Sequence, residues 1–345
     1  MGVVGLGKII GTYGSKSIER REFKKYRGKV YAIDAPVMIY KFCIALTGTE
    51  NGGSAHLFAC FFKTSSMLRY GIMPLWVFDG KPPDIKRETL MKRSAVKMNA
   101  VRELKRDGLS ESEQVKYARR SFTLNGEHVD EIKYLLSLLG LPFVQAPGEA
   151  EAQCAAFDIA GRTNGVVTDD WDVVLFGCKT MLKEFSNKCR VSEIDVDGLL
   201  GELEMTREQL IDLASILGND YCPGICNLRP IDAYLKFKSA RFNMHRFIKK
   251  IKMDGKYKVP SDFMSRWRDA KDYYLHALVM DPNDVNIVWN EPQYDLIYNF
   301  MVNVKGFESG LILQKLEEFR LMYQNYSKNN RLVTLRHYAP DAKAS

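Results

Sequence analysis

The chain has few of the features that mark membrane, secreted or zinc-binding proteins. Of its 345 residues, only five are histidine and seven are cysteine. No apolar run approaches the roughly 20 residues that cross a bilayer. The start, MGVVGLGKIIGTYG, lacks the basic-then-apolar pattern of a signal peptide. The odd number of cysteines, scattered from Cys43 to Cys226, indicates reduced thiols and no disulfide framework. A soluble intracellular protein without a membrane partner is expected.

Several familiar binding and catalytic motifs are also missing. Cys222 and Cys226 have no second Cys or His pair nearby, which argues against a zinc site. The histidines are dispersed and show no Ser-His-Asp or metal-ligand spacing. Gly5, Gly7 and Gly11 follow no strand, so a dinucleotide-binding loop is not expected. The chemistry of this protein must come from other residue types.

Charge is plentiful but unevenly distributed. The whole chain carries a net charge of +8, yet residues 16–29, 86–106 and 236–258 carry net +5, +6 and +8. Residues 141–220 carry net −9. An acidic centre between basic segments suits a polyanion held at its backbone near a carboxylate cluster. The simpler alternative is a set of solvated helix faces.

Short apolar runs alternate with longer helical patterns along the first 225 residues. The strand candidates are residues 29–33, 74–78, 141–145, 165–168 and 179–185. Helical periodicity fills residues 129–139 and 149–159, which predicts an α/β fold with a mostly parallel sheet. The charged stretch 86–121 has few core-type residues, which predicts a helical insertion that projects from the core. The chain after about residue 220 reads as helical.

Acidic residues follow these strands and turns, where ligands gather in parallel sheets. The seven candidates are Asp34, Asp79, Glu149, Glu151, Asp170, Asp172 and Asp220. If they converge, they repel one another unless divalent cations neutralise them, and oxygen-only ligands suit Mg²⁺ or Mn²⁺. Two such ions roughly 3.5–4 Å apart support in-line phosphodiester hydrolysis. For any single acid, a helix cap or a surface loop is the simpler explanation.

Six stretches of sequence carry a resemblance to a known family. They read MGVVGLGKII, YAIDAPVMIY, GIMPLWVFDGKPPDIK, LLSLLGLPFVQAPGEAEAQCAA, VVTDDWDVVLFG and LASILGNDY. Their order and spacing resemble the flap endonucleases, within the structure-specific 5′ nucleases that include exonuclease one and the xeroderma pigmentosum G nuclease. The resemblance implies a PIN-like nuclease core with a mostly parallel sheet, a helical arch and a C-terminal helical region. We expect nuclease regions at 1–105 and 122–225, an arch over about 80–130, and a helical DNA-binding region with a tail at 226–345.

The resemblance also implies roles for individual residues. It makes the seven acids metal ligands or their water-bridged neighbours, with Asp34, Asp79, Glu151 and Asp170 acting directly in catalysis. Asp169 replaces the Glu usually found before the Asp-x-Asp pair and is not expected to be a ligand. Lys86 and Arg93 lie seven residues apart on one helix face and match the family's contacts to the scissile phosphate. Tyr40 matches an aromatic residue that stacks on the terminal base, and Gly2 matches a residue near the active site.

The implied activity is cleavage of branched or nicked duplex DNA at a 5′ flap, with 5′–3′ exonuclease activity, in replication, repair or recombination. Two Mg²⁺ ions per site are expected, and Mn²⁺ can substitute. Alternatives are a 5′–3′ exonuclease of the same superfamily and a non-catalytic protein that binds DNA junctions. We expect a monomer in the nucleus, or in the host nucleus or cytoplasm if the protein is a compact viral member.

Two family features differ in this chain. The turn after Asp220 reads YCPGICNLRPIDAYLKF and lacks the family's Gly-x-Gly, so a bound potassium ion is not expected. Duplex binding is then expected to shift to basic residues of 236–258, among them Lys249, Lys250 and Lys252. The family's clamp-binding box is missing, which argues against binding to a sliding clamp.

Overall fold

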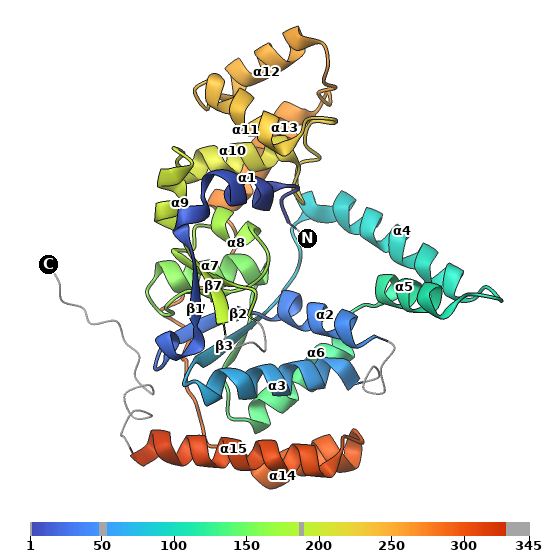
Figure 1. Cartoon of the computed structure of the whole chain (residues 1–345), viewed down its shortest axis with the longest axis vertical. Coiled ribbons are helices and arrows are strands. Elements are labelled where there is room, and N and C mark those ends of the chain that lie inside the picture. Colours follow the sequence, from blue (N-terminus) through green and yellow to red (C-terminus); the bar gives the residue numbers. More distant parts are fainter. Residues whose placement is uncertain (1, 48–53, 186–189, 329–345) are drawn as a thin grey trace, which may run out of the picture.

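The computed structural model describes residues 2–47, 54–185 and 190–328 (Figure 1). Seven strands lie within these residues: β1 (Ile18–Glu22), β2 (Val30–Asp34), β3 (Met73–Phe78), β4 (Phe143–Gln145), β5 (Val166–Val167), β6 (Thr180–Lys183) and β7 (Arg190–Asp195). They form one sheet in the order β1-β7-β6-β5-β2-β3-β4. Strands β6, β5, β2, β3 and β4 run parallel, whereas β7 and β1 pair antiparallel at one edge. The expected mostly parallel α/β sheet is confirmed.

The inner strands β2 and β3 are apolar except for Asp34, the last residue of β2. Every residue of β2 and β3 is buried, as expected for parallel strands covered by helices on both faces. Asp34 pairs with Val77 in the β2–β3 register, which brings the ends of these strands together. The edge strand β1 and its neighbour β7 are mostly polar and partly exposed, and local sequence patterns did not predict them. Their pattern is typical of an edge ribbon with one solvated face.

Helices cover both faces of the sheet. The helices of the body are α1 (Leu6–Tyr13), α2 (Ala35–Leu46), α3 (Ala55–Arg69), α6 (Gly126–Leu138), α7 (Ala150–Ile159), α8 (Asp172–Leu175), α9 (Val196–Glu202) and α10 (Arg207–Leu217). Among them, α2, α3, α7 and α9 pack directly on strands. Short helical turns η1 (Ser15–Ser17), η2 (Phe23–Tyr26) and η4 (Asp84–Lys86) connect them. Strands from both predicted nuclease regions join in the one sheet. No helix in the described part of the chain is long and apolar enough to span a membrane.

The C-terminal helices lie at opposite ends of the molecule (Figure 1). At one end are α11 (Pro230–Ser239), α12 (Met244–Asp254) and α13 (Phe263–Leu275), with α13 packed on α10. At the other end, α14 (Tyr294–Tyr298), the π-helical η5 (Asn299–Val304) and α15 (Ser309–Lys328) lie along α3 and α6. The predicted tail within 226–345 falls partly on residues 329–345, which lie outside the described residues.

Two helices project from this body as an arm (Figure 1). They are α4 (Arg87–Leu104) and α5 (Glu111–Ser121), which pack on each other. Ala100 is the one buried residue of α4, and α5 has none. Ser110 and Glu113 form a capping box that starts α5. A projecting, mostly charged helical insertion was predicted at 86–121, and we call α4 and α5 the arch.

Candidate active site

Acidic side chains gather where the central strands end. Asp34 closes β2 and begins α2, where it accepts a hydrogen bond from the Val37 backbone N–H at 3.4 Å. The Thr168 hydroxyl, just after β5, donates to the other carboxylate oxygen of Asp34 at 2.6 Å. Asp79 follows β3 and accepts from the Ala150 N–H, at the start of α7, at 2.8 Å. The strand ends and the N-terminus of α7 therefore fix both carboxylates.

A loop after β5 adds two further acids. The backbone N–H of Asp170 donates to the Thr168 hydroxyl at 3.1 Å, and the Asp172 N–H donates to Asp170 Oδ1 at 3.2 Å. Asp172 is buried, and its Oδ1 atom has no hydrogen-bond partner. A buried carboxylate oxygen without a partner is costly unless a donor or cation reaches it.

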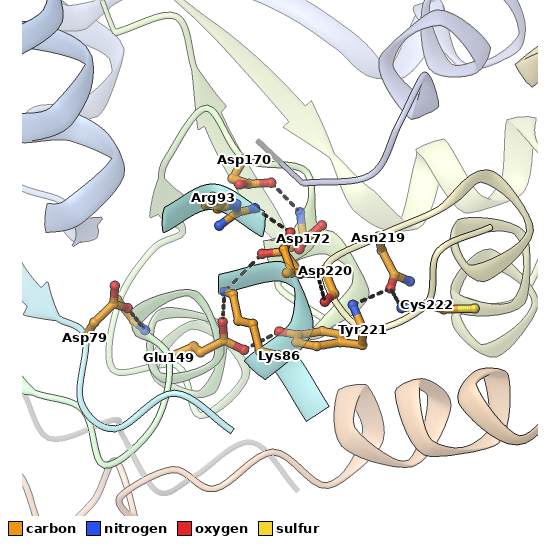
Figure 2. Close-up of polar contacts among 12 residues, drawn as sticks. Asp79, Lys86, Arg93, Glu149, Asp170, Asp172, Asn219, Asp220, Tyr221 and Cys222 are labelled. Atoms are coloured by element: carbon orange, nitrogen blue, oxygen red, sulfur yellow. Dashed lines mark hydrogen bonds and ion pairs between the residues drawn. The ribbon is translucent and has the colours of Figure 1, made fainter. Parts of the chain in front are cut away.

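Two cations from the base of the arch enter the same cluster (Figure 2). Lys86 Nζ binds Glu149 and lies 3.0 Å from Asp220 Oδ2. Arg93 Nη2 binds Asp220 Oδ1 at 2.5 Å. Glu149 precedes α7, and Asp220 follows α10, so the cations join two distant parts of the chain. These are buried or half-buried ion pairs, in which low polarity strengthens the attraction.

Two tyrosines that the sequence patterns did not single out lie beside Glu149. The Tyr221 hydroxyl donates to Glu149 Oε2, as Figure 2 shows. Tyr273, from α13, lies near Glu149, and burial together with the charge of this carboxylate raises the pKa of the Tyr273 hydroxyl. The two rings pack edge to face, 4.9 Å apart. The position of Tyr221 beside Asp220 was a usable signal, whereas nothing in the local sequence marks Tyr273.

Burial and mutual repulsion set the electrostatics of the cluster. Burial raises the pKa of five carboxyls: Asp34, Asp79, Glu151, Asp170 and Asp172. For Asp34, the charges of Asp79 and Asp170 raise the pKa further. For Lys86, burial lowers the pKa, but Glu149 and nearby acids outweigh burial, so the pKa is raised overall. The acids therefore favour the binding of positive charge.

The donor set fits a hard divalent cation, although the acids are spread out. In the described residues, no three His, Cys, Asp or Glu side chains are close enough to hold an ion as they stand. Lys86 and Arg93 lie against Glu149 and Asp220 in this arrangement. All candidate donors are oxygens, and Asp172 Oδ1 lacks a partner, which suits Mg²⁺ or Mn²⁺ rather than zinc.

A cavity of about 940 Å³ opens between α2 and the arch and reaches the cluster. Asp79, Glu151, Asp170 and Asp220 line one part of it, together with Lys86 and Arg93. Tyr40, Lys97, Arg119 and Arg120 lie elsewhere in its wall, among mostly apolar side chains of α2 and the arch. One cavity thus combines carboxylates, basic side chains and a half-buried aromatic ring, a combination suited to a phosphate chain that carries bases.

The other predicted residues fall in two places. Gly2 lies against the acids, because a Cβ atom there would come within 1.9 Å of Asp170 Oδ1. Lys249, Lys250 and Lys252 lie on the exposed face of α12, away from the cluster, and Lys250 donates to the Ser239 carbonyl at 2.8 Å. Asp169, which we did not expect to be a ligand, pairs with Lys41.

The fold and the acidic cluster together define an α/β protein with acidic residues at the ends of its central strands and a basic helical arch beside them. Known proteins share this arrangement. The XPG N-terminal domain matches residues 1–100, and the XPG I-region matches residues 140–220. Flap endonuclease 1 of Ovis aries is 34% identical, over 89% of this chain and 83% of its own. The chain therefore belongs to the flap endonucleases of the XPG family.

Solved structures agree with this assignment. The catalytic core of Rad2 in complex with a DNA substrate has a TM-score of 0.72 and 25% identity, over 92% of this chain and 100% of its own. Flap endonuclease-1 from Methanococcus jannaschii has a TM-score of 0.69 and 26% identity, over 92% of this chain and 98% of its own. The predicted resemblance to flap endonucleases is confirmed.

Proposed function

We propose that this protein is a structure-specific nuclease that cuts DNA near the junction of a 5′ flap and also trims 5′ ends. The observation that carries the proposal is the group of acids beside Lys86 and Arg93, of which Asp79, Glu151, Asp170 and Asp220 line a cavity that also contains basic side chains. Membership of the flap endonuclease family and the likeness to Rad2 bound to DNA support it.

The acids would hold two Mg²⁺ ions, with Mn²⁺ as a substitute. We assign the ligands and their water-bridged neighbours to Asp34, Asp79, Glu149, Glu151, Asp170, Asp172 and Asp220. Bound metal supplies an activated water and charge stabilisation for phosphodiester hydrolysis. Tyr221 orients Glu149, and Thr168 orients Asp34. Such partners of metal ligands fix ligand orientation.

Basic and aromatic residues would bind the DNA. Lys86 and Arg93 would bind the scissile phosphate, where their charge favours the transition state. Tyr40, in the wall of the cavity, would stack on the terminal base without regard to its identity. Gly2 would keep the space beside Asp170 open. Lys249 and Lys252 would contact duplex phosphates from α12, with Lys250 alongside.

Further features of the proposal rest on the family and the sequence. We assign the protein to the nucleus, as a monomer, with nuclease regions at 1–105 and 122–225 and a DNA-binding region within 226–345. We assign its flap cleavage to DNA replication and repair. A sliding clamp is not among the proposed partners, because the described sequence has no clamp-binding box.

The test is cleavage of matched labelled substrates. The protein is incubated with 5′-flap, 3′-flap, nicked and single-stranded DNA, with Mg²⁺ or with EDTA. We expect Mg²⁺-dependent cuts near the 5′-flap junction and none in Asp170→Asn. Stepwise trimming of nicked DNA with uncut flaps would favour the exonuclease alternative. Tight binding to all branched substrates without any cut would favour the non-catalytic one.

A further inference from the structure

The arch helix α4 is held to the body mainly through polar contacts near its start. Ala100 is the one buried residue of this 18-residue helix, so packing alone cannot fix its direction. Lys86 immediately precedes the helix, and Arg93 lies two turns into it. The placement of both cations therefore depends on what anchors the first turns of α4.

Some of these anchors use groups that belong to the proposed reaction. Lys86 and Arg93 bind Glu149 and Asp220, which are proposed metal ligands. These contacts compete with metal and phosphate for the same charges. The Thr89 hydroxyl donates to the Asp220 backbone carbonyl at 2.7 Å, and this contact does not involve a carboxylate.

A further anchor lies outside the acidic cluster. Glu88, in the first turn of α4, forms an ion pair with Arg266 of α13. Arg266 Nε also donates to Asp262 at 2.6 Å, and Lys92 Nζ lies 2.7 Å from Glu88. Hydrogen bonds from Lys92 and Arg266 lower the pKa of Glu88 to about 2, so the carboxylate stays charged. Each member of the pair therefore has a second partner: Asp262 also holds the Arg266 guanidinium, and Lys92 also holds the Glu88 carboxylate.

Helix α13 is itself fixed to the body near the cluster. Trp267 Nε1 donates to Asp212 of α10 at 2.7 Å. Tyr273, which packs on Tyr221 near Glu149, lies seven residues after Arg266 and thus on the same helical face. One face of α13 therefore touches both the base of the arch and the acidic cluster.

We propose that Arg266 is a positioning residue: it holds the first turn of α4 on α13 and so keeps Lys86 and Arg93 directed at the scissile phosphate. This inference rests on the proposed nuclease function. It assigns a role in cleavage to a residue that contacts neither the acids of the cluster nor the cavity. It also links the arch to the helical region that carries the basic face of α12.

The expected effect is modest, because the pair is partly exposed. The side chains of Arg266 and Glu88 are 35% and 47% exposed. Exposed ion pairs contribute little on their own. We therefore expect Arg266→Ala to lower the single-turnover rate by about three- to fivefold, within the range of such pairs.

The experiment is a double-mutant cycle on Glu88 and Arg266, measured on 5′-flap DNA with enzyme in excess. Arg266→Ala, Glu88→Ala and the double variant should lose the same factor in rate, while the DNA dissociation constant changes by less than about twofold. Arg266→Lys should recover part of the rate, and the swap of Glu88→Arg with Arg266→Glu should recover more than either single change. Additive losses, or equal losses in rate and affinity, would overturn the proposal.

A matched control pair is available at the other end of the body. Arg69 of α3 binds Glu318 of α15 at 2.6 Å, which is also an Arg–Glu pair between two helices. Arg69→Ala should leave the cleavage rate within about twofold of wild type, as expected for a surface change far from the site. A loss equal to that of Arg266→Ala would show a general stability effect and contradict the proposal.

A readout without DNA or metal separates this inference from the proposed function. Amide hydrogen exchange of residues 87–93 should be at least about threefold faster in Arg266→Ala than in wild type, with exchange of 111–121 unchanged. Unchanged exchange at 87–93 would overturn the anchoring role even if wild type cuts flaps as expected. Faster exchange with an inactive wild type would refute the nuclease function alone.

Discussion

The acids and the cations of the site are held in different ways. Asp34 and Asp79 end or follow strands that are buried at every position, so core packing fixes them. Lys86 and Arg93 lie at the start of a helix with one buried residue, and ion pairs hold them. The acids thus belong to the packed sheet, whereas the cations belong to the arch, which projects from the body (Figure 1). The comparison indicates that the strand ends fix the positions of Asp34 and Asp79, whereas the placement of the phosphate-binding cations depends on contacts at the base of the arch.

The largest expected effect comes from removing an acid. Asp79→Asn or Asp170→Asn should lower the single-turnover rate by more than about 10³-fold, because a ligand of the metal-assisted reaction is lost. Affinity for DNA should change little, since the basic segments remain. In metal-free buffer, each variant should unfold at a higher temperature than wild type, because a neutral amide relieves repulsion among buried carboxylates. Calorimetry and rapid-quench cleavage would measure both; near wild-type rates would refute the ligand assignment.

Removing a cation should have the next largest effect. Lys86→Ala and Arg93→Ala should each reduce the single-turnover rate by about 10²-fold, with a much smaller loss of affinity, because their charge acts on the transition state. The measurement pairs single-turnover rates with binding titrations on the same flap. If rate and affinity fell by equal factors, these residues would be general phosphate contacts.

The basic face of α12 should affect affinity rather than rate. Replacing Lys249, Lys250 and Lys252 together by alanine should flatten the salt dependence of duplex binding by up to about three units of slope, roughly one per lost phosphate contact. Lys250 already donates to Ser239, so Lys249→Ala with Lys252→Ala should account for most of the change. A salt slope equal to that of wild type would mean that the duplex binds to another surface of the protein.

Stability changes should distinguish the body from the arch. Ile33→Val, in fully buried β2, should cost about 0.5–1.5 kcal/mol of unfolding free energy. Val101→Ala, on α4, should cost less than about 0.5 kcal/mol, because that side chain is 44% exposed. Denaturant unfolding would measure both. Equal costs would mean that the arch is packed more tightly than its burial indicates.

The smallest expected effect is a pH dependence within the body. His56 of α3 is buried, binds Glu131 of α6 at 2.7 Å, and packs near His128 and Lys305. Burial lowers the pKa of His56, so the fold disfavours its protonated form. Stability from this group is therefore complete above about pH 6.5, the ordinary histidine value, and is lost as pH falls below it. Unfolding of His56→Phe between pH 5 and 8 should show a shallower loss than wild type, and an equally steep loss would contradict this role.

Local patterns were sufficient to predict the central strands. Apolar runs that end in an acid predicted β2 and β3 within one residue at either end, because buried parallel strands need continuous apolar sequence. The polar strands β1 and β7 were missed, since their pairing depends on the whole sheet. For the same reason, local patterns did not show that Tyr273 packs on Tyr221 or that Arg266 reaches Glu88. These contacts join distant segments and follow from how the helices pack.

The most direct test of the comparison is a thermal-unfolding titration with Mg²⁺ in the absence of DNA. Wild type should gain stability with Mg²⁺, by about 2.7 kcal/mol at 100 times the dissociation constant. Lys86→Ala should gain at least as much, because Glu149 and Asp220 lose a competing cation. Asp170→Asn should gain far less than either. This pattern would show that the acids alone form the metal site. Equal gains in wild type and Asp170→Asn, or loss of the gain in Lys86→Ala, would contradict it.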